Sequence, residues 1–512
     1  MKKLKTSLAW LDTHILKALV FGFIVLIPLY PKLPLRMINY TYVAVRLEDI
    51  YLAIMVGVFF VQLLRKRVVL PRYLTILFVI YWALNFISYL YGYFVQNTVI
   101  INHLGLLHSL RRVEYMSIFF IAYATVKSKR DFFQYLSLML VVLGIVSIYG
   151  MGQKFLGWPA VQTMNPEFAK GYILVLESWS RISSTFAGHY DLSAYLIVLM
   201  TVLIGFYLYT NKKAYLGLFL ISLGALVLAG SRASYLAYVG VMILYLGYVK
   251  KIKLLIFVLV ATAIFTPLSD NLSNRLSRTF QQTKVYVDSE TGDAFVARNI
   301  VPDDLPPGDF GASSEIPAVG SGVKLTEKEE VQAKKQIRES IAKQAQDVGK
   351  QYTVEELNLL VEQMFARQIP MIKYLPDISI STRLQVSWPR AFRAFTKNFL
   401  IGSGPSSLGE ATDGDYLRWL GEVGILGTTA LLSIFAVIAL RIFKAARRMN
   451  KRDSYLFHGF VFAFIALFVN ASYIDIFEAS KVAYTFWLLA GIYYAGIHYF
   501  HAKRIPVRQL KV

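Results

Sequence analysis

The chain has 512 residues, of which 56% are hydrophobic and only 17% charged, with no cysteine and a formal net charge of +22. A soluble protein carries about 25% charged residues, and the apolar residues here form runs of the ~20 residues that a bilayer-crossing helix needs, so the composition excludes a soluble enzyme, a disordered chain and an all-β secreted module. The lack of cysteine excludes disulfides, thiolate metal sites and a cysteine nucleophile, and no nucleic-acid partner is implied, because the excess positive charge lies between the apolar runs.

Twelve apolar segments predict transmembrane helices. They cover about 14–30, 47–64, 72–94, 113–126, 132–152, 190–210, 214–230, 232–249, 252–268, 415–440, 455–474 and 480–500. The first segment follows a basic start, as in a signal peptide, but it ends without a small-x-small cleavage site, so we expect it to be retained. The expected fold is an all-α polytopic membrane protein with about twelve transmembrane helices, nine within 1–268 and three within 415–512.

The connections between these segments alternate in charge. Basic residues gather in the following set: 2–5, 65–67, 127–130, 212–213, 250–253, 441–452 and 503–511. Short cytoplasmic loops are enriched in Lys and Arg, so this set should face the cytoplasm. Both termini are then cytoplasmic, and the expected location is the cytoplasmic (inner) membrane.

Three outer connections are longer than a tight turn. Residues 95–112 predict a short helix on the membrane surface, and residues 153–189 form the second connection. The third, 269–414, is the only substantial polar region and would form one large periplasmic loop between spans nine and ten. Within it, residues 325–369 have a helical composition, whereas 301–308 indicates irregular chain.

Arginine residues border several spans on the outer side. A charge next to hydrocarbon is costly, so each is a functional candidate, although a lone arginine there can also serve as a headgroup anchor. Arg181 precedes the sixth span, and His189 stands at its start. Arg232 lies in the hairpin between spans seven and eight.

The segment 380–397 predicts a helix on the membrane surface. Its apolar residues follow helical spacing, and its cations, among them Arg383 and Arg393, occupy a second stripe that would face lipid headgroups or a bound phosphate. Pro389 predicts a kink within this helix.

Acidic residues at the start of the tenth span allow two interpretations. Asp413 and Asp415 stand where aspartate caps a helix, but Asp413 could instead accept a proton from a substrate hydroxyl. Glu422 falls inside the span, where an acid needs a partner, and Arg418, one turn earlier, is the expected one. The acidic residues lack metal-ligand spacing and the histidines are scattered, so no metal site is expected.

The order of these features resembles the O-antigen ligase/O-antigen polymerase family. Beside the twelve-span layout, the resemblance is carried by Arg181 with Ser-Thr-Phe at 184–186, Gly-Ser-Arg at 230–232, Arg383 with Trp388, Gly-Ser-Gly at 402–404, and Y-L-x-x-L-x-E-x-G-x-x-G at 416–427. It implies a glycosyl transferase of bacterial cell-envelope polysaccharide or lipopolysaccharide biosynthesis that needs neither metal nor cofactor. The implied substrates are an undecaprenyl-diphosphate-linked glycan donor and a hydroxyl of a glycan or lipid acceptor, joined on the outer face of the cytoplasmic membrane.

The resemblance also assigns roles to the arginines. Arg181, Arg232 and Arg383 match arginines thought to hold the diphosphate. Arg393 matches a spacing to Gly404 that occurs in polymerase loops. Independently of the family, a diphosphate leaving group needs cations that stay charged in a poorly hydrated site, and guanidinium groups bind phosphate oxygens in pairs. Such groups would stabilise the charge that grows as the sugar–phosphate bond breaks.

The histidine of the ligases is missing here. In ligases a histidine before the Y-L motif is thought to activate the acceptor, and in this chain Asp413 takes that place. The difference favours a polymerase or a divergent member and makes Asp413 the candidate base. His189, close to Arg181 in the sequence, is a further candidate for binding the substrate.

Two other classes of function stay open. One is a lipid-linked oligosaccharide flippase or another twelve-span transporter; transporters usually have two matching halves and broken helices near the midplane, whereas the halves here differ. The other is an assembly role, in which the large loop docks other polysaccharide-assembly proteins.

Overall fold

The computed structural model describes residues 2–37, 44–161, 163, 172–177, 180–269, 272–273, 282–288, 294–296, parts of 330–342, 352–366, 368–374, 383–409 and 412–500, and, from 14 onward, most of their side chains. The chain forms two compact units. One comprises Met1–Arg275 with Ser381–Val512, and the other comprises Leu276–Ile380. The irregular stretch predicted at 301–308 lies outside the described residues.

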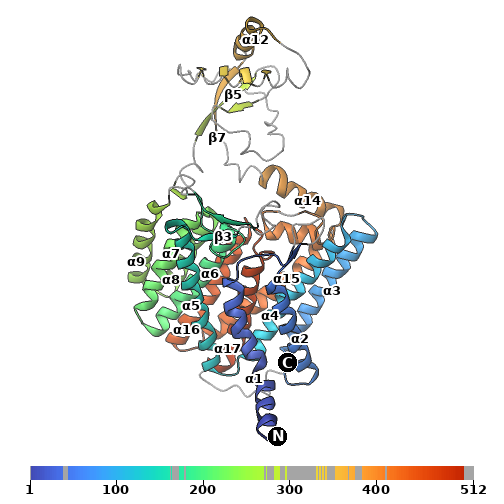
Figure 1. Cartoon of the computed structure of the whole chain (residues 1–512), viewed down its shortest axis with the longest axis vertical. Helices are drawn as coiled ribbons and strands as arrows, with labels where there is room; N and C mark the ends of the chain where they lie inside the picture. Colours follow the sequence, from blue (N-terminus) through green and yellow to red (C-terminus); the bar gives the residue numbers. More distant parts are fainter. Residues whose placement is uncertain are drawn as a thin grey trace. The chain divides into compact units, whose positions relative to one another are not determined.

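A helix covers each of the twelve predicted apolar segments (Figure 1). These helices are α1 (Lys2–Leu29), α2 (Leu47–Leu64), α3 (Arg72–Phe94), α4 (Asn102–Thr125), α5 (Lys129–Phe155), α6 (His189–Thr210), α7 (Ala214–Ala229), α8 (Arg232–Tyr248), α9 (Ile252–Phe265), α15 (Asp415–Ala446), α16 (Lys451–Ala471) and α17 (Ser480–Phe500). Within the described part of the chain, α2, α3, α5, α6, α15 and α16 are long and apolar enough to cross a membrane, and shorter apolar helices occupy 14–29, 214–229 and 252–268. The predicted helical, membrane-embedded type of fold is confirmed.

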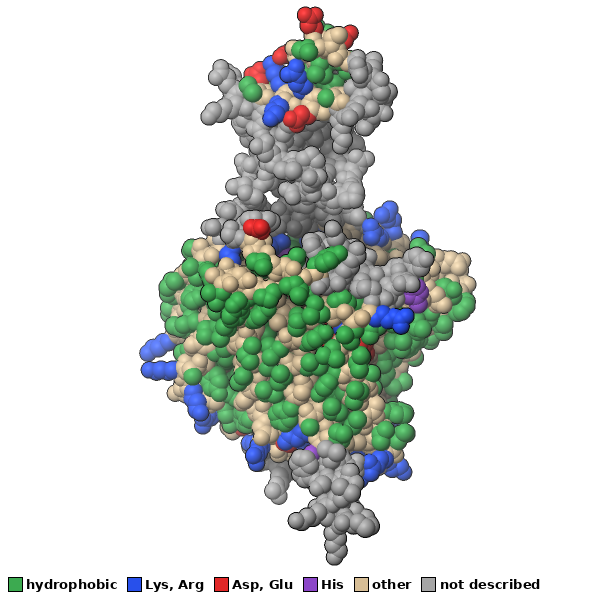
Figure 2. Space-filling model, viewed as in Figure 1, with side chains coloured by type: hydrophobic (Ala, Val, Ile, Leu, Met, Phe, Trp, Pro, Cys, Tyr) green, Lys and Arg blue, Asp and Glu red, His purple; other side chains and the backbone are tan. Residues whose placement is uncertain are grey.

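The helices pack as a membrane protein does, with large apolar side chains both inside and outside. α6 is buried almost throughout and packs against α16 and α7, while α17 packs against α4. The α4–α17 contact needs a residue without a side chain, because a Cβ on Gly491 would lie 2.4 Å from the Phe119 carbonyl oxygen. Figure 2 shows hydrophobic side chains over the lateral surface of the bundle. Phe60 of α2 and Val79 of α3 are among the exposed large apolar side chains.

The region before the fourth predicted span differs from the prediction. A separate surface helix was expected over 95–112, but α4 runs without interruption from Asn102 to Thr125. This stretch contains no proline, and its one glycine lies in the first turn, so nothing ends the helix at residue 112. Arg112 is consequently buried inside the bundle instead of lying at its surface.

Short strands accompany the predominantly helical fold. β1 (Arg36–Met37) pairs with β2 (Ala44–Val45), and β3 (Pro159–Val161) pairs with β4 (Ile173–Val175). In the second unit, an antiparallel sheet has the order β6-β5-β7 and comprises β5 (Gln282–Asp288), β6 (Ala294–Val296) and β7 (Gln368–Tyr374).

The second unit also has a small helical core. α12 (Val354–Ala366) contributes Val361, which packs with Ile337 and Ile341 of the preceding helical turns. Within the described residues, the helical composition predicted over 325–369 corresponds to helix in parts of 330–342 and in α12, whereas 368–369 belong to β7. The strand β7 was not predicted, because its partner β5 lies about 85 residues away and strand formation depends on such non-local pairing.

Candidate functional site

The predicted site residues lie at one end of the bundle. Asn470 at the end of α16 donates a hydrogen bond to the Ser234 hydroxyl near the start of α8, at 2.8 Å. Lys481 at the start of α17 donates to the Thr185 carbonyl oxygen just before α6, at 2.7 Å. The starts of α6, α8, α15 and α17 therefore share one end, which we call the outer end after the orientation predicted from the charges.

Arg383 comes from a turn that leads into a helix along the outer end. The π-helical turn η4 (Arg383–Ser387) continues directly into α14 (Trp388–Lys397), which packs against α15. Pro389 lies in the first turn of α14, where its missing N–H is tolerated. It therefore marks the start of the helix and is not the internal kink that the sequence predicted.

The structure brings Arg383 and Asp413 together. The Arg383 Nη2 atom lies 3.3 Å from Asp413 Oδ1, and its Nε donates a hydrogen bond to the Tyr473 carbonyl oxygen at 3.0 Å. The guanidinium also stacks on the Tyr473 ring, 3.8 Å from its centroid. The Arg383 side chain is only 4% exposed, whereas the Asp413 side chain is 30% exposed. The buried Arg383 guanidinium therefore pairs with an Asp413 carboxylate that is accessible to solvent.

The backbone of Asp413 is held in an unusual conformation. Its φ is +56°, in the left-handed region that non-glycine residues rarely adopt. The Asp475 carboxylate accepts hydrogen bonds from three successive backbone N–H groups: those of Thr412 at 2.7 Å, Asp413 at 3.1 Å and Gly414 at 3.0 Å. Strained backbone that is fixed by its surroundings is typical of functional sites.

A reciprocal contact runs from the start of α15 to the connection between α16 and α17, and it is made by Asp415. Its carboxylate is buried and accepts hydrogen bonds from the backbone N–H groups of Ile476, at 2.7 Å, and Phe477, at 3.2 Å. Asp475 and Asp415 thus hold the start of α15 and the 472–479 connection together. The sequence predicted a cap of α15 itself at Asp415, but the carboxylate caps the neighbouring connection instead.

The local environment sets the protonation of Asp413. Burial raises the pKa of this carboxyl, and the Arg383 guanidinium counteracts only part of that rise. A base with a raised pKa is a stronger proton acceptor than an ordinary aspartate. Chemically, the pair can hold an anion with its arginine and accept a proton with its aspartate.

A buried ionic network lies next to this pair. Glu422 forms ion pairs with Arg418, at 3.3 Å, as predicted, and also with Arg112 of α4. Arg112 in turn donates to Glu478 at 2.8 Å, and Arg418 to Asp475 at 3.0 Å. Burial alone would raise the pKa of Glu478, but Arg112 and Arg418 outweigh it and lower the pKa to about 2. This carboxylate is therefore ionised at any physiological pH.

α15 is broken at Gly424, next to Glu422. Gly424 has φ +61° and ψ −168°, which no helical residue adopts. The chain at 399–404 lies against the break, where Gly404 N–H donates to the Glu422 carbonyl at 2.9 Å and Ile425 N–H donates to the Phe399 carbonyl at 3.0 Å. Two motifs singled out in the sequence, 402–404 and 416–427, therefore touch. Non-helical backbone at membrane depth requires such protein partners.

Replacement of Gly424 by alanine should destabilise the protein by roughly 3 kcal/mol. The added Cβ would lie 2.4 Å from the Leu400 carbonyl oxygen, in a backbone conformation that alanine avoids. Thermal unfolding of the detergent-purified protein measures the effect. Gly240→Ala in α8 is the matched control, because a Cβ there has no neighbour within 4 Å. Equal melting temperatures of the two variants would contradict the expected strain.

Arg181 and His189 meet on a second part of the outer end. The Arg181 guanidinium lies 5.7 Å from the Tyr190 ring centroid, and the His189 ring lies 4.0 Å from that same ring. His189 is the first residue of α6 and is buried. Arg232 is the first residue of α8, after the left-handed Gly230, and is half-buried.

Arg393 is placed differently. Its side chain is exposed on α14, beside the exposed Phe392. The structure therefore brings it onto a surface typical of a helix at the membrane interface.

The connection between α16 and α17 contacts several of the motif regions, but the sequence motifs did not identify it as part of the site. Tyr473 accepts from Arg383, Asp475 binds the 412–414 backbone, and Lys481 reaches Thr185. The sequence does contain one indication of a functional role. The stretch 472–481 places two acids and a lysine between apolar spans, where charge is costly.

A second buried ion pair was not predicted from the sequence. Lys32, after α1, lies 3.6 Å from Glu48 of α2, and its ammonium donates to Ser480 at the start of α17. Burial lowers the pKa of Lys32, against the influence of Glu48. This group ties the first two helices to the last one at the outer end.

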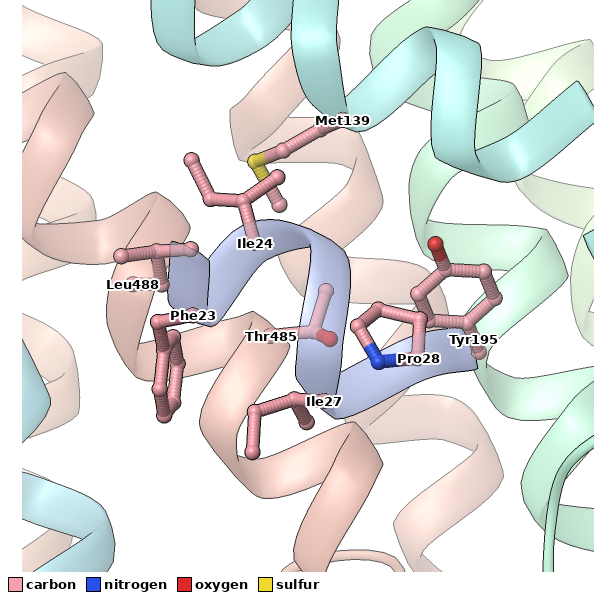
Figure 3. Close-up of a pocket in the computed structure, with 8 residues that line it drawn as sticks. All are labelled: Phe23, Ile24, Ile27, Pro28, Met139, Tyr195, Thr485 and Leu488. Atoms are coloured by element: carbon pink, nitrogen blue, oxygen red, sulfur yellow. The ribbon is translucent and has the colours of Figure 1, made fainter. Parts of the chain in front are cut away.

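An apolar cavity lies between α1, α5, α6 and α17 (Figure 3). Its lining is Phe23, Ile24, Ile27, Pro28, Met139, Tyr195, Thr485 and Leu488. The volume of about 10 Å³ is that of one water at most, so this cavity cannot hold a glycan or a diphosphate.

Comparisons with known proteins give no family. No protein-family model matches the chain, and no curated protein matches it. An assignment of function therefore depends on the sequence motifs and on the geometry of the outer end.

Proposed function

We propose that this chain is a glycosyl transferase of the O-antigen ligase/polymerase type. It has twelve transmembrane spans and cytoplasmic termini, and it transfers or polymerises a polyprenyl-diphosphate-linked glycan onto an acceptor hydroxyl at the outer face of the cytoplasmic membrane, without a metal. The observation that carries the proposal is the contact of 3.3 Å between Arg383 and Asp413, which come from two of the motifs that resemble the family.

The proposed reaction uses the two groups in turn. The acceptor oxygen attacks the anomeric carbon, the bond from that carbon to the phosphate oxygen breaks, and polyprenyl diphosphate leaves with the bonding electrons. The acceptor proton moves to Asp413, which is accessible to solvent. Once Asp413 is neutral, it no longer offsets the charge of Arg383, whose attraction for the departing diphosphate then grows. Arg181 and Arg232 supply further positive charge at the same end of the bundle.

The pH dependence of transfer follows from the raised pKa of Asp413. The base is active only when deprotonated, so the rate should fall as the pH falls through that pKa. Because the pKa lies above the usual aspartate range, the acid limb should lie above about pH 4. Transfer from a purified lipid-linked donor across a pH series measures it, with thermal unfolding at each pH as the control for the fold. A rate that is flat down to pH 4 would contradict the role of Asp413.

The topology can be tested directly. The unit formed by Leu276–Ile380 should lie outside and both termini inside. A reporter inserted at Gly308 that is active only in the periplasm should therefore be active, and the same reporter at the C-terminus should not. The opposite pattern would place Arg383 and Asp413 on the cytoplasmic side and remove the donor site from the proposed face.

Deletion of the gene tests the function as a whole. Loss of long surface chains with one repeat unit retained indicates a polymerase, and complete chains stranded on the lipid carrier indicate a ligase. Unchanged surface glycan counts against both. The unit formed by Leu276–Ile380 is also a candidate docking surface for other polysaccharide-assembly proteins.

One observation favours the alternative of a lipid-linked oligosaccharide flippase. α15 is broken at Gly424 beside buried ion pairs, and broken helices are typical of transporters. Purified protein in vesicles with a fluorescent lipid-linked glycan separates the two functions. A flippase moves the probe between leaflets unchanged, whereas a transferase produces a new glycosidic bond.

A further inference from the structure

A second cavity lies at the opposite end of the bundle from the proposed site. Its volume is about 290 Å³, close to the lower end of small-ligand sites. It is lined by residues 14–17 of α1, by the end of α2 and the following turn, and by the α4–α5 connection. α2 and α4 end here, whereas they begin at the outer end, so the cavity belongs to the end predicted to face the cytoplasm.

The lining of this cavity carries a net positive charge. Among the described residues that line it, three cations, Lys17, Arg67 and Lys127, stand against one carboxylate, Asp131, with His14 as a further titratable group. The carboxylate is already well bound, because Asp131 pairs with Lys17 and accepts hydrogen bonds from the Lys127 backbone N–H at 3.0 Å and the Ser128 hydroxyl at 2.9 Å. An anion that enters the cavity therefore meets an excess of cations.

The backbone holds Arg67 at the cavity. α2 ends in a tight turn in which Lys66 has φ +54° and the Arg67 N–H donates to the Gln62 carbonyl at 3.0 Å. Arg67 and Lys127 are exposed, while Gln62 and Thr125 are buried, so cations stand at the mouth and neutral polar groups lie deeper. Such a basic hollow between transmembrane helices on the cytoplasmic side suits an anionic headgroup.

We propose that this cavity, the inner basic cavity, binds a phosphate group, either that of an anionic phospholipid headgroup or free phosphate. The guanidinium of Arg67 can hold two phosphate oxygens, and the ammonium of Lys127 adds a point charge. The proposal is independent of glycosyl transfer, because the cavity lies at the other end of the bundle.

Lipid retention measures this binding. The full chain is reconstituted in vesicles of phosphatidylglycerol or of phosphatidylcholine, extracted into detergent, and examined by native mass spectrometry for retained lipid. The parental protein should retain phosphatidylglycerol about tenfold more than phosphatidylcholine, and an Arg67→Gln/Lys127→Gln double variant should lose that preference. A Lys212→Gln/Lys213→Gln variant, with exposed cations at the same end but outside the cavity, is the matched control and should keep the preference.

A second arm identifies the source of the phosphate. Inorganic phosphate is titrated into lipid-depleted protein, and thermal unfolding is recorded. A shift that matches the one given by phosphatidylglycerol assigns the cavity to free phosphate, and a shift with the lipid alone assigns it to the headgroup.

A further variant tests lipid binding even if the Arg67→Gln/Lys127→Gln double variant does not fold. Val68→Glu places a carboxylate in the half-buried lining and should abolish the preference for phosphatidylglycerol. Equal retention of both lipids by the parental protein together with no thermal shift in inorganic phosphate, or a Val68→Glu variant that keeps the parental response to the ligand, would overturn the proposal.

Discussion

Replacement of Arg383 by alanine should reduce glycan transfer by at least ~10³-fold, while the protein still inserts into the membrane. The guanidinium is buried, fixed by Tyr473 and in contact with Asp413, so alanine removes the cation that pairs with the proposed base. Arg383→Lys should restore little activity, because an ammonium keeps the charge but loses the planar fork. The measurement is the transfer rate on a purified lipid-linked donor in vesicles.

The control for this variant lies on the same segment. Lys397→Ala removes an exposed cation from the last turn of α14 and should leave the rate near the parental value. Since Arg383 also binds the Tyr473 carbonyl, thermal unfolding of each variant separates loss of the fold from loss of chemistry. A folded Arg383→Ala variant with parental activity would exclude the proposed donor site.

Asp413→Asn should slow transfer by about 10²- to 10⁴-fold without weakening donor binding. Asparagine tolerates the left-handed backbone at this position, and its amide oxygen can still accept from Arg383, so the fold should be retained. What is lost is the ability to accept a proton. Transfer at the parental rate would mean that Asp413 only holds Arg383, and the base would then be sought at His189 or at Asp191, which lies in the first turn of α6.

Asp415→Asn is not a neutral control for this experiment. The place of Asp415 at a helix start in the sequence predicts only a capping role and therefore little effect of this substitution. In the structure the carboxylate accepts from the Ile476 and Phe477 N–H groups in a buried position. An amide would point its own NH₂ group at one of these donors, so we expect a loss of stability.

Local features of this molecule were predictable from the sequence. The bounds of α2, α3 and α17 agree with the predicted 47–64, 72–94 and 480–500, because an apolar run determines a membrane helix by itself. The Arg418–Glu422 pair was also predictable, because residues four apart share one face of a helix.

Contacts between distant segments were not predictable in the same way. Arg112 and Glu478 lie 366 residues apart in the sequence, and their pairing depends on how α4 packs beside α17. The same holds for Asp475, whose three backbone partners precede α15. The candidate pair Arg383–Asp413 could be suspected from motif order, but the connection that holds it in place could not.

The 472–481 connection also has a consequence for biogenesis. During synthesis, Arg112 enters the membrane long before its acidic partners Glu422 and Glu478 are made, and Asp413 precedes Asp475. Until α16 and α17 follow, the nascent bundle contains uncompensated buried charge, which is unstable in hydrocarbon and accessible to membrane quality control. Insertion of the final hairpin is then the step that brings Glu478 to Arg112 and Asp475 to Arg418, so we expect a chain that stops short of it to be unstable.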